Sequence, residues 1–195
     1  ELKNLVEFLL SDADGDKVGY ESGDKQNFLP TKNFKLSVNP QEVLASGTLP
    51  ANLKDQITPA LTWTYNKNHV TKDNLGLLDI LAHNNWKRPI YFAITVPSEN
   101  YAGLDKYLYK EGFAYRLLPL QASATPDKEL INTSTMYTNM MTKFRWGNMK
   151  NASYLDTESN RMVLIIINNF NILAKQLLAE GKIDEAKKTL DKCRE

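Results

Sequence analysis

The chain has 195 residues, of which 42% are hydrophobic and 24% are charged, and its formal net charge at pH 7 is +1. This composition allows a packed core and an ordinary surface, and it lacks the basic footprint of a nucleic-acid-binding protein, so we expect no nucleic-acid partner. The longest apolar run, Met162–Ile167, is far shorter than the roughly 20 residues that cross a bilayer. We therefore expect that this chain does not span a membrane. The single cysteine, Cys193, excludes an internal disulfide.

The first third of the chain predicts one helix and two half-buried strands. A short amphipathic helix is expected at 2–10, followed by a polar loop rich in Asp and Gly at 11–26. Apolar and polar residues alternate over 34–38 and again over 61–65, which is typical of strands with one buried face. A helical turn is expected between these strands, at 40–45.

The segment 72–96 predicts a helix, a turn and a buried strand. The helix is expected over 72–84 with Thr71 at its start, and Asn84 and Asn85 are expected to end it because asparagine tolerates the left-handed backbone conformation. Pro89 leads into the segment 90–96, which is apolar almost without interruption and is typical of a strand covered on both faces. Tyr91 is therefore expected to be buried.

Residues 101–128 predict a further helix, a strand and a loop. The helix is expected over 101–111, with Leu104, Tyr107 and Leu108 on one face and Gly112 as its end. A strand at 114–120 and a polar loop at 121–128 follow. The alternation of strands and helices from 61 to 120 favours parallel strands joined by right-handed crossovers. We therefore predict an α/β domain over 1–130, with a small mixed or mostly parallel sheet and covering helices.

Residues 131–195 predict a helical extension. Helices are expected at 134–146 and 158–180, Gly181 ends the second, and a last helix carries Ile183, Ala186, Leu190 and Cys193. The hairpin at 162–195 contains the fragment LLAEGKIDEAKKTLDKC, which resembles a tetratricopeptide unit; an ordinary helical hairpin is the alternative. A single such unit cannot bury its own apolar face, so it would pack on the α/β domain or continue into further repeats.

No set of residues in the sequence forms a convincing catalytic or metal site. Asp12, Asp14 and Asp16 have the spacing of calcium ligands, but Lys17 and Gly23 stand where such a loop needs its glycine and its bidentate glutamate. A solvated acidic turn is therefore the favoured interpretation. The only histidines, His69 and His83, have no second ligand at metal spacing. We predict no catalytic residue, metal or cofactor in this chain.

One group of aromatic and basic residues is a candidate ligand or partner surface. These residues lie near predicted strand ends, where open α/β sheets bind ligands, and their rings can stack on sugars while arginine can hold phosphate or carboxylate. The group consists of Trp86, Lys87, Arg88, Tyr101, Tyr115 and Arg116. Structural packing is the alternative, because Trp86 is equally well explained as a lid on the core.

Four sequence blocks in fixed order carry a resemblance to a known family. They are LDILAHNNWKRPIYFA, YAGLDKYLYKEGFAYRLLPL, MYTNMMTKFRWGN and YLDTESNRM, and FLPTKNFKLSV near the start is similar to the same family. Together they resemble the C-terminal soluble region of a bacterial family of large polytopic membrane proteins of unknown function. The resemblance covers nearly all of the chain, which begins with Glu1 rather than Met and is expected to be a piece of a longer protein.

This resemblance implies an upstream membrane domain in the same chain. That domain is similar to glycosyltransferases that use lipid-linked sugars, notably the protein O-mannosyltransferase type, and the resemblance places the catalytic carboxylates there. It also implies that tetratricopeptide repeats follow this region, and that the region lies on the extracytoplasmic, periplasmic side of the inner membrane.

Two functional hypotheses follow from these observations. The first is a non-catalytic accessory domain of a membrane-bound glycosyltransferase-like protein, which recognises or positions a protein or glycan acceptor. The alternative is a protein-interaction module built on the tetratricopeptide-like helices. A free-standing small-molecule enzyme is a weaker option, because the sequence offers no cluster of titratable groups for it.

Overall fold

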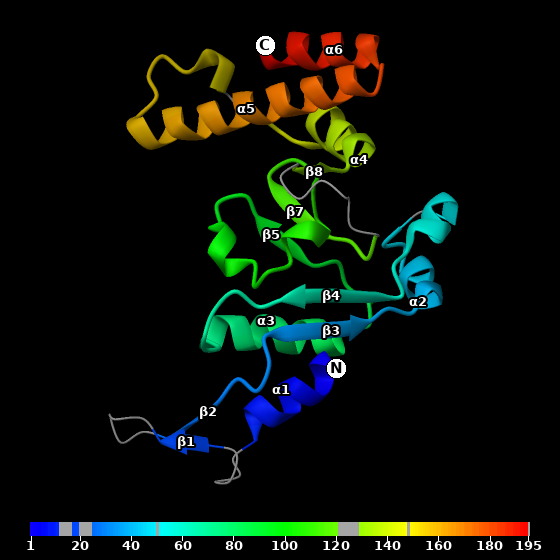
Figure 1. Cartoon of the computed structure of the whole chain (residues 1–195). Helices are drawn as coiled ribbons and strands as arrows, with labels where there is room; N and C mark the ends of the chain where they lie inside the picture. Colours follow the sequence, from blue (N-terminus) through cyan, green and yellow to red (C-terminus); the bar gives the residue numbers. More distant parts are fainter. Residues whose placement is uncertain (12–16, 20–24, 50, 121–128, 148, 195) are drawn as a thin grey trace. The chain divides into compact units, whose positions relative to one another are not determined.

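A computed structural model describes residues 1–11, 17–19, 25–49, 51–120, 129–147 and 149–194 (Figure 1). It divides the chain into two compact units, which are described separately below. The first unit comprises Glu1–Leu108 and Arg116–Lys128, and the second comprises Tyr109–Tyr115 and Glu129–Glu195. The acidic turn with Asp12, Asp14 and Asp16 and the loop 121–128 lie outside the described residues. The predicted domain boundary at residue 130 stays a prediction.

The first unit begins with the predicted amphipathic helix. Helix α1 (Leu2–Leu10) buries Leu2, Leu5 and Val6 on one face and packs against α3 and β3. Two short strands then pair antiparallel, β1 (Lys17–Gly19) and β2 (Lys25–Asn27). The expectation of an unbroken loop over 11–26 was therefore wrong. Strands of three residues are too short to show an alternating pattern in the sequence.

Both alternating segments form strands, as predicted. Strand β3 (Asn33–Ser37) pairs antiparallel with β4 (Ala60–Thr64), and the register places Phe34 opposite Trp63. Both rings are buried, with their centroids 5.6 Å apart in an edge-to-face arrangement. The predicted helical turn is α2 (Pro40–Ala45), and a short 3₁₀ helix (Ala51–Gln56) follows it.

The predicted parallel crossover from the strand at 61–65 to the strand at 90–96 does not form. The strands β5 (Tyr91–Ala93), β6 (Leu108–Lys110), β7 (Ala114–Leu117) and β8 (Leu130–Ile131) form a separate sheet of order β5-β7-β6-β8. In that sheet β6 and β8 are parallel, whereas β4 is paired only with β3. The boundary between the two units runs through β6 and β7. The predicted fold class, α/β with small sheets of mixed orientation and covering helices, is confirmed.

Helix α3 (Lys72–His83) and its C-terminal turn agree with the prediction. Leu78, Leu81 and Ala82 are buried on the inner face of the helix. The backbone enters the left-handed region directly after the helix, with φ at 45° for Asn85. The expectation that an asparagine would end this helix in the left-handed conformation is therefore confirmed.

The strand after Pro89 is shorter and more exposed than predicted. Strand β5 has three residues, and of these only Phe92 is buried. Tyr91 is 46% exposed, so the prediction of a strand covered on both faces, with a buried Tyr91, was wrong. A continuous apolar run does not by itself show that both faces are covered, because its length here reflects a turn after β5 as well as the strand.

The helix predicted over 101–111 does not form. Ala102 and Gly103 have positive φ angles of 55° and 85°, a 3₁₀ helix spans Asp105–Tyr107, and β6 follows at once. Leu104, Tyr107 and Leu108 are buried as expected, but on a turn and a strand. The physical reason is a tertiary contact: a Cβ atom on Gly103 would lie 2.2 Å from the Thr64 carbonyl oxygen, so the chain passes too close to β4 for a helix.

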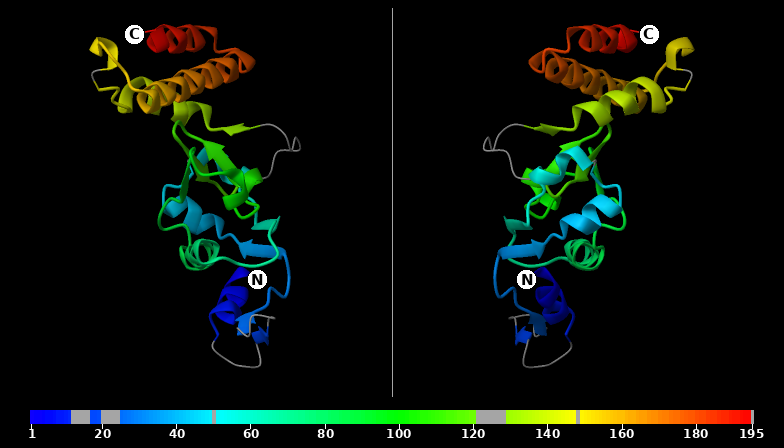
Figure 2. Two further views of the ribbon diagram at one scale, coloured as in Figure 1. Left: turned by 90° about the vertical axis from the view of Figure 1, so that its left-hand side faces the viewer. Right: turned by 90° about the vertical axis from the view of Figure 1, so that its right-hand side faces the viewer.

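The second unit is mainly helical, as predicted. Helix α4 (Thr133–Thr138) continues as a π-helix (Asn139–Lys143), which ends three residues before the predicted end. Helices α5 (Thr157–Ala179) and α6 (Ile183–Arg194) form a hairpin around Gly181, whose φ is 76° (Figures 1 and 2). The core of the second unit consists of Met136, Met140, Phe170, Leu173, Leu177 and Ala186. The tetratricopeptide-like identity of this hairpin stays a prediction.

Candidate functional site

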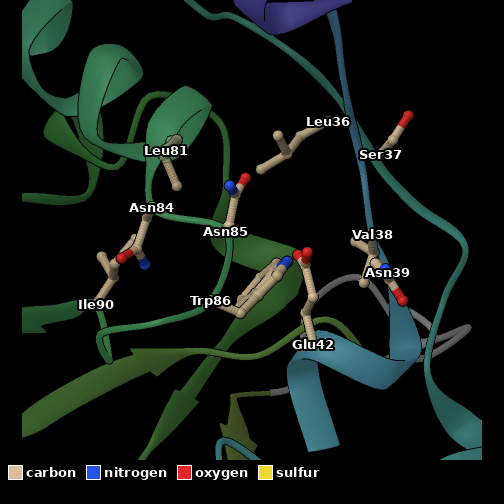
Figure 3. A pocket seen from close by; sticks show the side chains of 10 residues that line it. All are labelled: Leu36, Ser37, Val38, Asn39, Glu42, Leu81, Asn84, Asn85, Trp86 and Ile90. Atoms are coloured by element: carbon tan, nitrogen blue, oxygen red, sulfur yellow. The ribbon is translucent and has the colours of Figure 1, made fainter. Parts of the chain in front are cut away.

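A cavity of about 190 Å³ lies in the first unit and is lined by two segments that are far apart in the sequence, 36–42 and 81–90 (Figure 3). The end of β3 and the start of α2 form one wall, with Leu36, Val38 and Glu42. The end of α3 and the turn after it form the opposite wall, with Leu81 and residues 84–86. Ile90 completes the lining.

The turn between α3 and β5 fixes the position of Trp86. The Asn84 side chain donates a hydrogen bond to the Arg88 carbonyl at 2.7 Å and accepts one from the Arg88 amide at 3.2 Å. Within this closed turn, Asn85 and Trp86 both have positive φ angles, 45° and 60°. A bulky residue in this conformation costs about 1–3 kcal/mol and persists only where neighbouring contacts enforce it, which is frequent at functional sites.

Trp86 combines this strained backbone with a buried ring that lines the cavity. Its side chain is only 7% exposed, and its carbonyl accepts a long hydrogen bond from the Thr48 hydroxyl at 3.5 Å. Figure 3 shows the indole ring and the Glu42 carboxylate pointing toward one another. The cavity therefore has an aromatic wall next to a carboxylate.

Some polar groups of the cavity already have hydrogen-bond partners within the protein, and others do not. Both polar atoms of the Asn84 amide are bonded to Arg88, and the Asn39 Oδ1 atom accepts from the Gln41 amide at 3.0 Å. Ser37 is bonded to Glu1, whose pKa is lowered chiefly by the hydrogen bond from the Ser37 amide. Within the described part of the chain, the structure gives the Glu42 carboxylate, the Asn85 amide and the Asn39 Nδ2 atom no hydrogen-bond partner.

The structure describes each of the six residues of the predicted ligand surface, which stays a prediction. Of the six, only Trp86 lines the cavity. Lys87 and Arg88 follow it on the turn and are exposed. Tyr101 packs edge-to-face on Phe92, with ring centroids 5.4 Å apart.

The other two predicted residues make local contacts. The Arg116 guanidinium lies 5.7 Å from the centroid of the Tyr91 ring in the first unit. In the second unit, the Tyr115 hydroxyl donates to Glu129 at 2.6 Å, and the Lys110 ammonium lies 5.5 Å from its ring centroid.

The sequence analysis missed Glu42, Asn39 and Asn85 as cavity residues. Asn39 and Glu42 read as ordinary residues at the start of α2, because nothing local connects them with Trp86. The available signal was the pair Asn84-Asn85 directly before a tryptophan, since two asparagines ahead of a bulky residue indicate a left-handed turn that exposes or directs that residue.

The second unit has a larger and more apolar groove, of about 380 Å³, along α5 and α6. Trp146, Ile166 and Phe170 line it together with Cys193. The Cys193 thiol is half-buried, and burial raises its pKa, so it packs as a small apolar side chain rather than as a reactive thiolate. The Lys192 side chain is the charged group of this lining.

Within the described residues, no group of three or more His, Cys, Asp and Glu side chains could hold a metal ion. His83 instead faces Asp79 one turn earlier on α3, with 3.0 Å between its Nδ1 atom and the Asp79 carboxylate. Both side chains are about half exposed, so this pair belongs to the surface of the helix. The cavity beside Trp86 is thus suited to binding through its ring, amides and carboxylate.

These features define an α/β domain with a small cavity of mixed polarity, followed by a helical hairpin. The family described as TMEM260-associated domain 2 matches residues 1–135, which include the whole lining of the cavity, and the chain belongs to this family. It is therefore a domain associated with a family of membrane proteins. No curated protein and no solved structure matches the chain.

One helix of the described residues has the length and composition of a membrane span. Helix α5 contains an 18-residue window with a mean hydropathy of 1.5, of which 28% is buried. The core helix of a globular domain passes the same test, and α5 contributes Phe170, Leu173 and Leu177 to the core of the second unit. This property of α5 is therefore weak evidence for a membrane span.

Proposed function

We propose that this chain is a non-catalytic accessory domain of a membrane-bound glycosyltransferase-like protein, and that it recognises or positions the acceptor. Membership in a membrane-associated domain family supports the link to a membrane protein. The resemblance of the sequence blocks to a bacterial family of protein O-mannosyltransferase type supports the proposal that this membrane protein is glycosyltransferase-like. In this proposal the catalytic carboxylates belong to an upstream membrane domain of the same protein.

The observation that carries this proposal is the cavity beside Trp86. It joins a strained turn, a fixed aromatic ring and polar groups that the fold does not use, and this combination is typical of a binding site rather than of a structural contact. The titratable side chain of its lining is Glu42 alone, and acid–base catalysis on an acceptor would require a partner group that the cavity does not supply.

The decisive experiment uses the full-length protein in membranes. Glu42→Gln and Asn85→Gly, both at exposed positions, are expected to lower the transfer rate or to change which acceptor is used, while the level of folded protein stays the same. Lys87→Ala is the matched control, because Lys87 is exposed on the same turn and does not line the cavity. Unchanged rate and acceptor choice in both cavity variants would overturn the proposal.

The proposal also places this domain on the extracytoplasmic, periplasmic side of the inner membrane. The support is the resemblance alone. A fusion of alkaline phosphatase directly after Glu195 of this domain, within the full-length protein, tests it, because that enzyme needs an oxidising compartment to form its disulfides. Activity of the fusion is the expected result, and an inactive but intact fusion would place the domain in the cytoplasm.

A second candidate function is a protein-interaction module built on tetratricopeptide-like helices. A specific observation favours it: α5 exposes Met162, Leu164 and Ile167 by 46%, 66% and 37%, next to the apolar groove of the second unit. Exposed apolar patches of this kind often mark interaction sites. In a pull-down from membranes with the full-length protein, Leu164→Glu should lose a partner that the wild type retains; recovery of the same partners by both would reject this function.

A further inference from the structure

The cavity beside Trp86 offers hydrogen-bonding groups of both kinds next to one aromatic ring. The Glu42 carboxylate accepts hydrogen bonds, whereas the Asn85 amide can donate and accept and the Asn39 Nδ2 atom can donate. Leu81 and Val38 are buried and form the apolar remainder of the lining. A ligand that fits must therefore carry donors and acceptors around its edge and an apolar face.

The size of the cavity limits the part of a ligand inside it to about a single ring. Its volume of about 190 Å³ is below the range of about 300–1,000 Å³ that is usual for pockets of drug-sized ligands. A larger molecule, such as a glycan, would place one ring in the cavity and leave its other parts outside. A ring of five or six atoms with hydroxyl substituents is the size of molecule that such a cavity encloses.

The charge of the cavity excludes anionic ligands. Glu42 is the only charged residue of the lining, and its carboxylate would repel phosphate or carboxylate groups. The basic side chains of Lys87 and Arg88 are nearby in sequence, but they do not line the cavity. A neutral ligand whose hydroxyl groups donate to the carboxylate gains charge-assisted hydrogen bonds instead.

We infer that this cavity binds one neutral sugar ring, which packs against the part of the Trp86 indole that lines the cavity. Two sugar hydroxyls donate to the Glu42 carboxylate, and the Asn85 and Asn39 amides bond to hydroxyls at the adjoining edge. This inference rests on the proposed function, because it makes the sugar a residue of the acceptor or its glycan. It assigns the recognition to this domain rather than to the membrane domain.

The turn after α3 prepares the site before the ligand arrives. Because both polar atoms of the Asn84 amide are bonded to Arg88, the backbone turn that carries Asn85 and Trp86 is held in place without the ligand. Such preorganisation lowers the entropic cost of binding, which matters for a ligand with few atoms. Asn84 is thus a positioning residue and not a contact to the sugar.

The test is an NMR titration of the 195-residue chain labelled with ¹⁵N. The chain has three tryptophans, and their indole N–H signals report separately on Trp86, on Trp63 in the core and on Trp146 in the second unit. The probes are methyl α-mannoside, methyl α-glucoside and methyl α-galactoside, with free mannose to distinguish a linked sugar from a free one. Inorganic phosphate and tetramethylammonium serve as charged probes.

The expected result is a saturable shift of the Trp86 signal with at least one methyl glycoside in the millimolar range, without a shift of the Trp146 signal. Glu42→Gln should weaken this binding about tenfold, because it replaces charge-assisted hydrogen bonds by neutral ones. Asn85→Gly should weaken it too, since glycine keeps the left-handed turn and removes the amide. Lys87→Ala should bind as the wild type does.

Several results would overturn the inference. The inference fails if no glycoside shifts the Trp86 signal, or if phosphate or tetramethylammonium shifts that signal more strongly than the glycosides do. It also fails if free mannose binds more tightly than methyl α-mannoside, or if Glu42→Gln binds glycosides with the affinity of the wild type. An unchanged Trp63 signal shows that each variant is folded. If glycosides do not bind but the cavity variants still alter acceptor choice in the full-length protein, the inference fails and the proposed function stands. If glycosides bind but transfer is unaffected, the proposed function fails.

Discussion

The hydroxyl group of Tyr107 bonds to both backbone groups of Thr62: it accepts from the Thr62 amide at 3.0 Å and donates to the Thr62 carbonyl at 3.2 Å. Thr62 is the central residue of β4, whose opposite edge pairs with β3. A tyrosine side chain thus satisfies backbone groups at which another strand would otherwise pair. This contact explains why β4 belongs to a two-stranded sheet although further strands follow it in the sequence.

Tyr107→Phe should therefore destabilise the first unit. The substitution keeps the ring, which is only 3% exposed, and removes both hydrogen bonds, so we expect a loss of about 1–2 kcal/mol in the free energy of unfolding. Urea unfolding measures this loss. Tyr154→Phe is the control, because Tyr154 is 81% exposed and should change stability by less than about 0.5 kcal/mol. Equal stability of the two variants would show that the Thr62 contact is not needed.

Two glycines should respond to alanine in opposite directions. Gly103 has a φ of 85°, and a Cβ atom there would lie 2.2 Å from the Thr64 carbonyl oxygen, so Gly103→Ala should cost at least about 2 kcal/mol. Gly76 lies inside α3 with nothing within 4 Å of an added Cβ atom. Gly76→Ala should therefore stabilise the chain by about 0.5–1 kcal/mol. Thermal unfolding of both variants tests the pair, and a destabilised Gly76→Ala would contradict it.

These contacts also show which parts of the fold a sequence can predict. Strands β3 and β4 and helices α5 and α6 were predicted because their apolar residues recur with the period of the element itself. The helix expected over 101–111 failed although Leu104, Tyr107 and Leu108 have helical spacing. The close approach of Gly103 to β4 prevents a helix there, and this contact between distant segments cannot be read from the local sequence pattern.

Some residues of the candidate site could also be singled out from the sequence, and others could not. Trp86 could be singled out because it follows a predicted helix end, and the left-handed turn was expected from the asparagines before it. Glu42 and Asn39 could not, because their link to Trp86 exists only once β3 and α2 are folded beside the end of α3. Tyr115 and Arg116 were grouped with Trp86 because all three lie near predicted strand ends, but the lining of the cavity comes from 36–42 and 81–90 and not from β7.

The turn that holds Trp86 should depend on the Asn84 side chain. Asn84→Ala removes two hydrogen bonds to Arg88, so we expect a loss of about 1 kcal/mol in the free energy of unfolding and a shifted Trp86 indole signal. Asn68→Ala is a suitable control, because the Asn68 side chain bonds only to the exposed Lys32 ammonium, at 2.6 Å. Calorimetry and NMR together test this, and an unmoved Trp86 signal would show that the turn is held by other contacts.

Glu180 gives the second unit a defined acid sensitivity. Burial alone would raise the pKa of Glu180, but hydrogen bonds from Lys182, Thr133 and Gln176 outweigh burial and lower its pKa from 4.5 to about 2. The Thr133 hydroxyl donates at 2.6 Å and thereby ties the start of α4 to the end of α5. Because the folded-state pKa is the lower one, this carboxylate stabilises the fold above pH 4.5, and the contribution is lost as the pH falls through 4.5 toward 2.

Glu180→Gln should therefore destabilise the chain at neutral pH and lose that effect in acid. Since the side chain is 30% exposed, solvent screening reduces the expected difference to about 1 kcal/mol at pH 7. The difference between wild type and variant should shrink steadily below pH 4.5 in urea unfolding at a series of pH values. Glu158→Gln is the control, because the Glu158 carboxylate is 73% exposed and only 3.6 Å from Arg161. A pH-independent difference for Glu180→Gln would mean that shape, and not charge, connects α4 with α5.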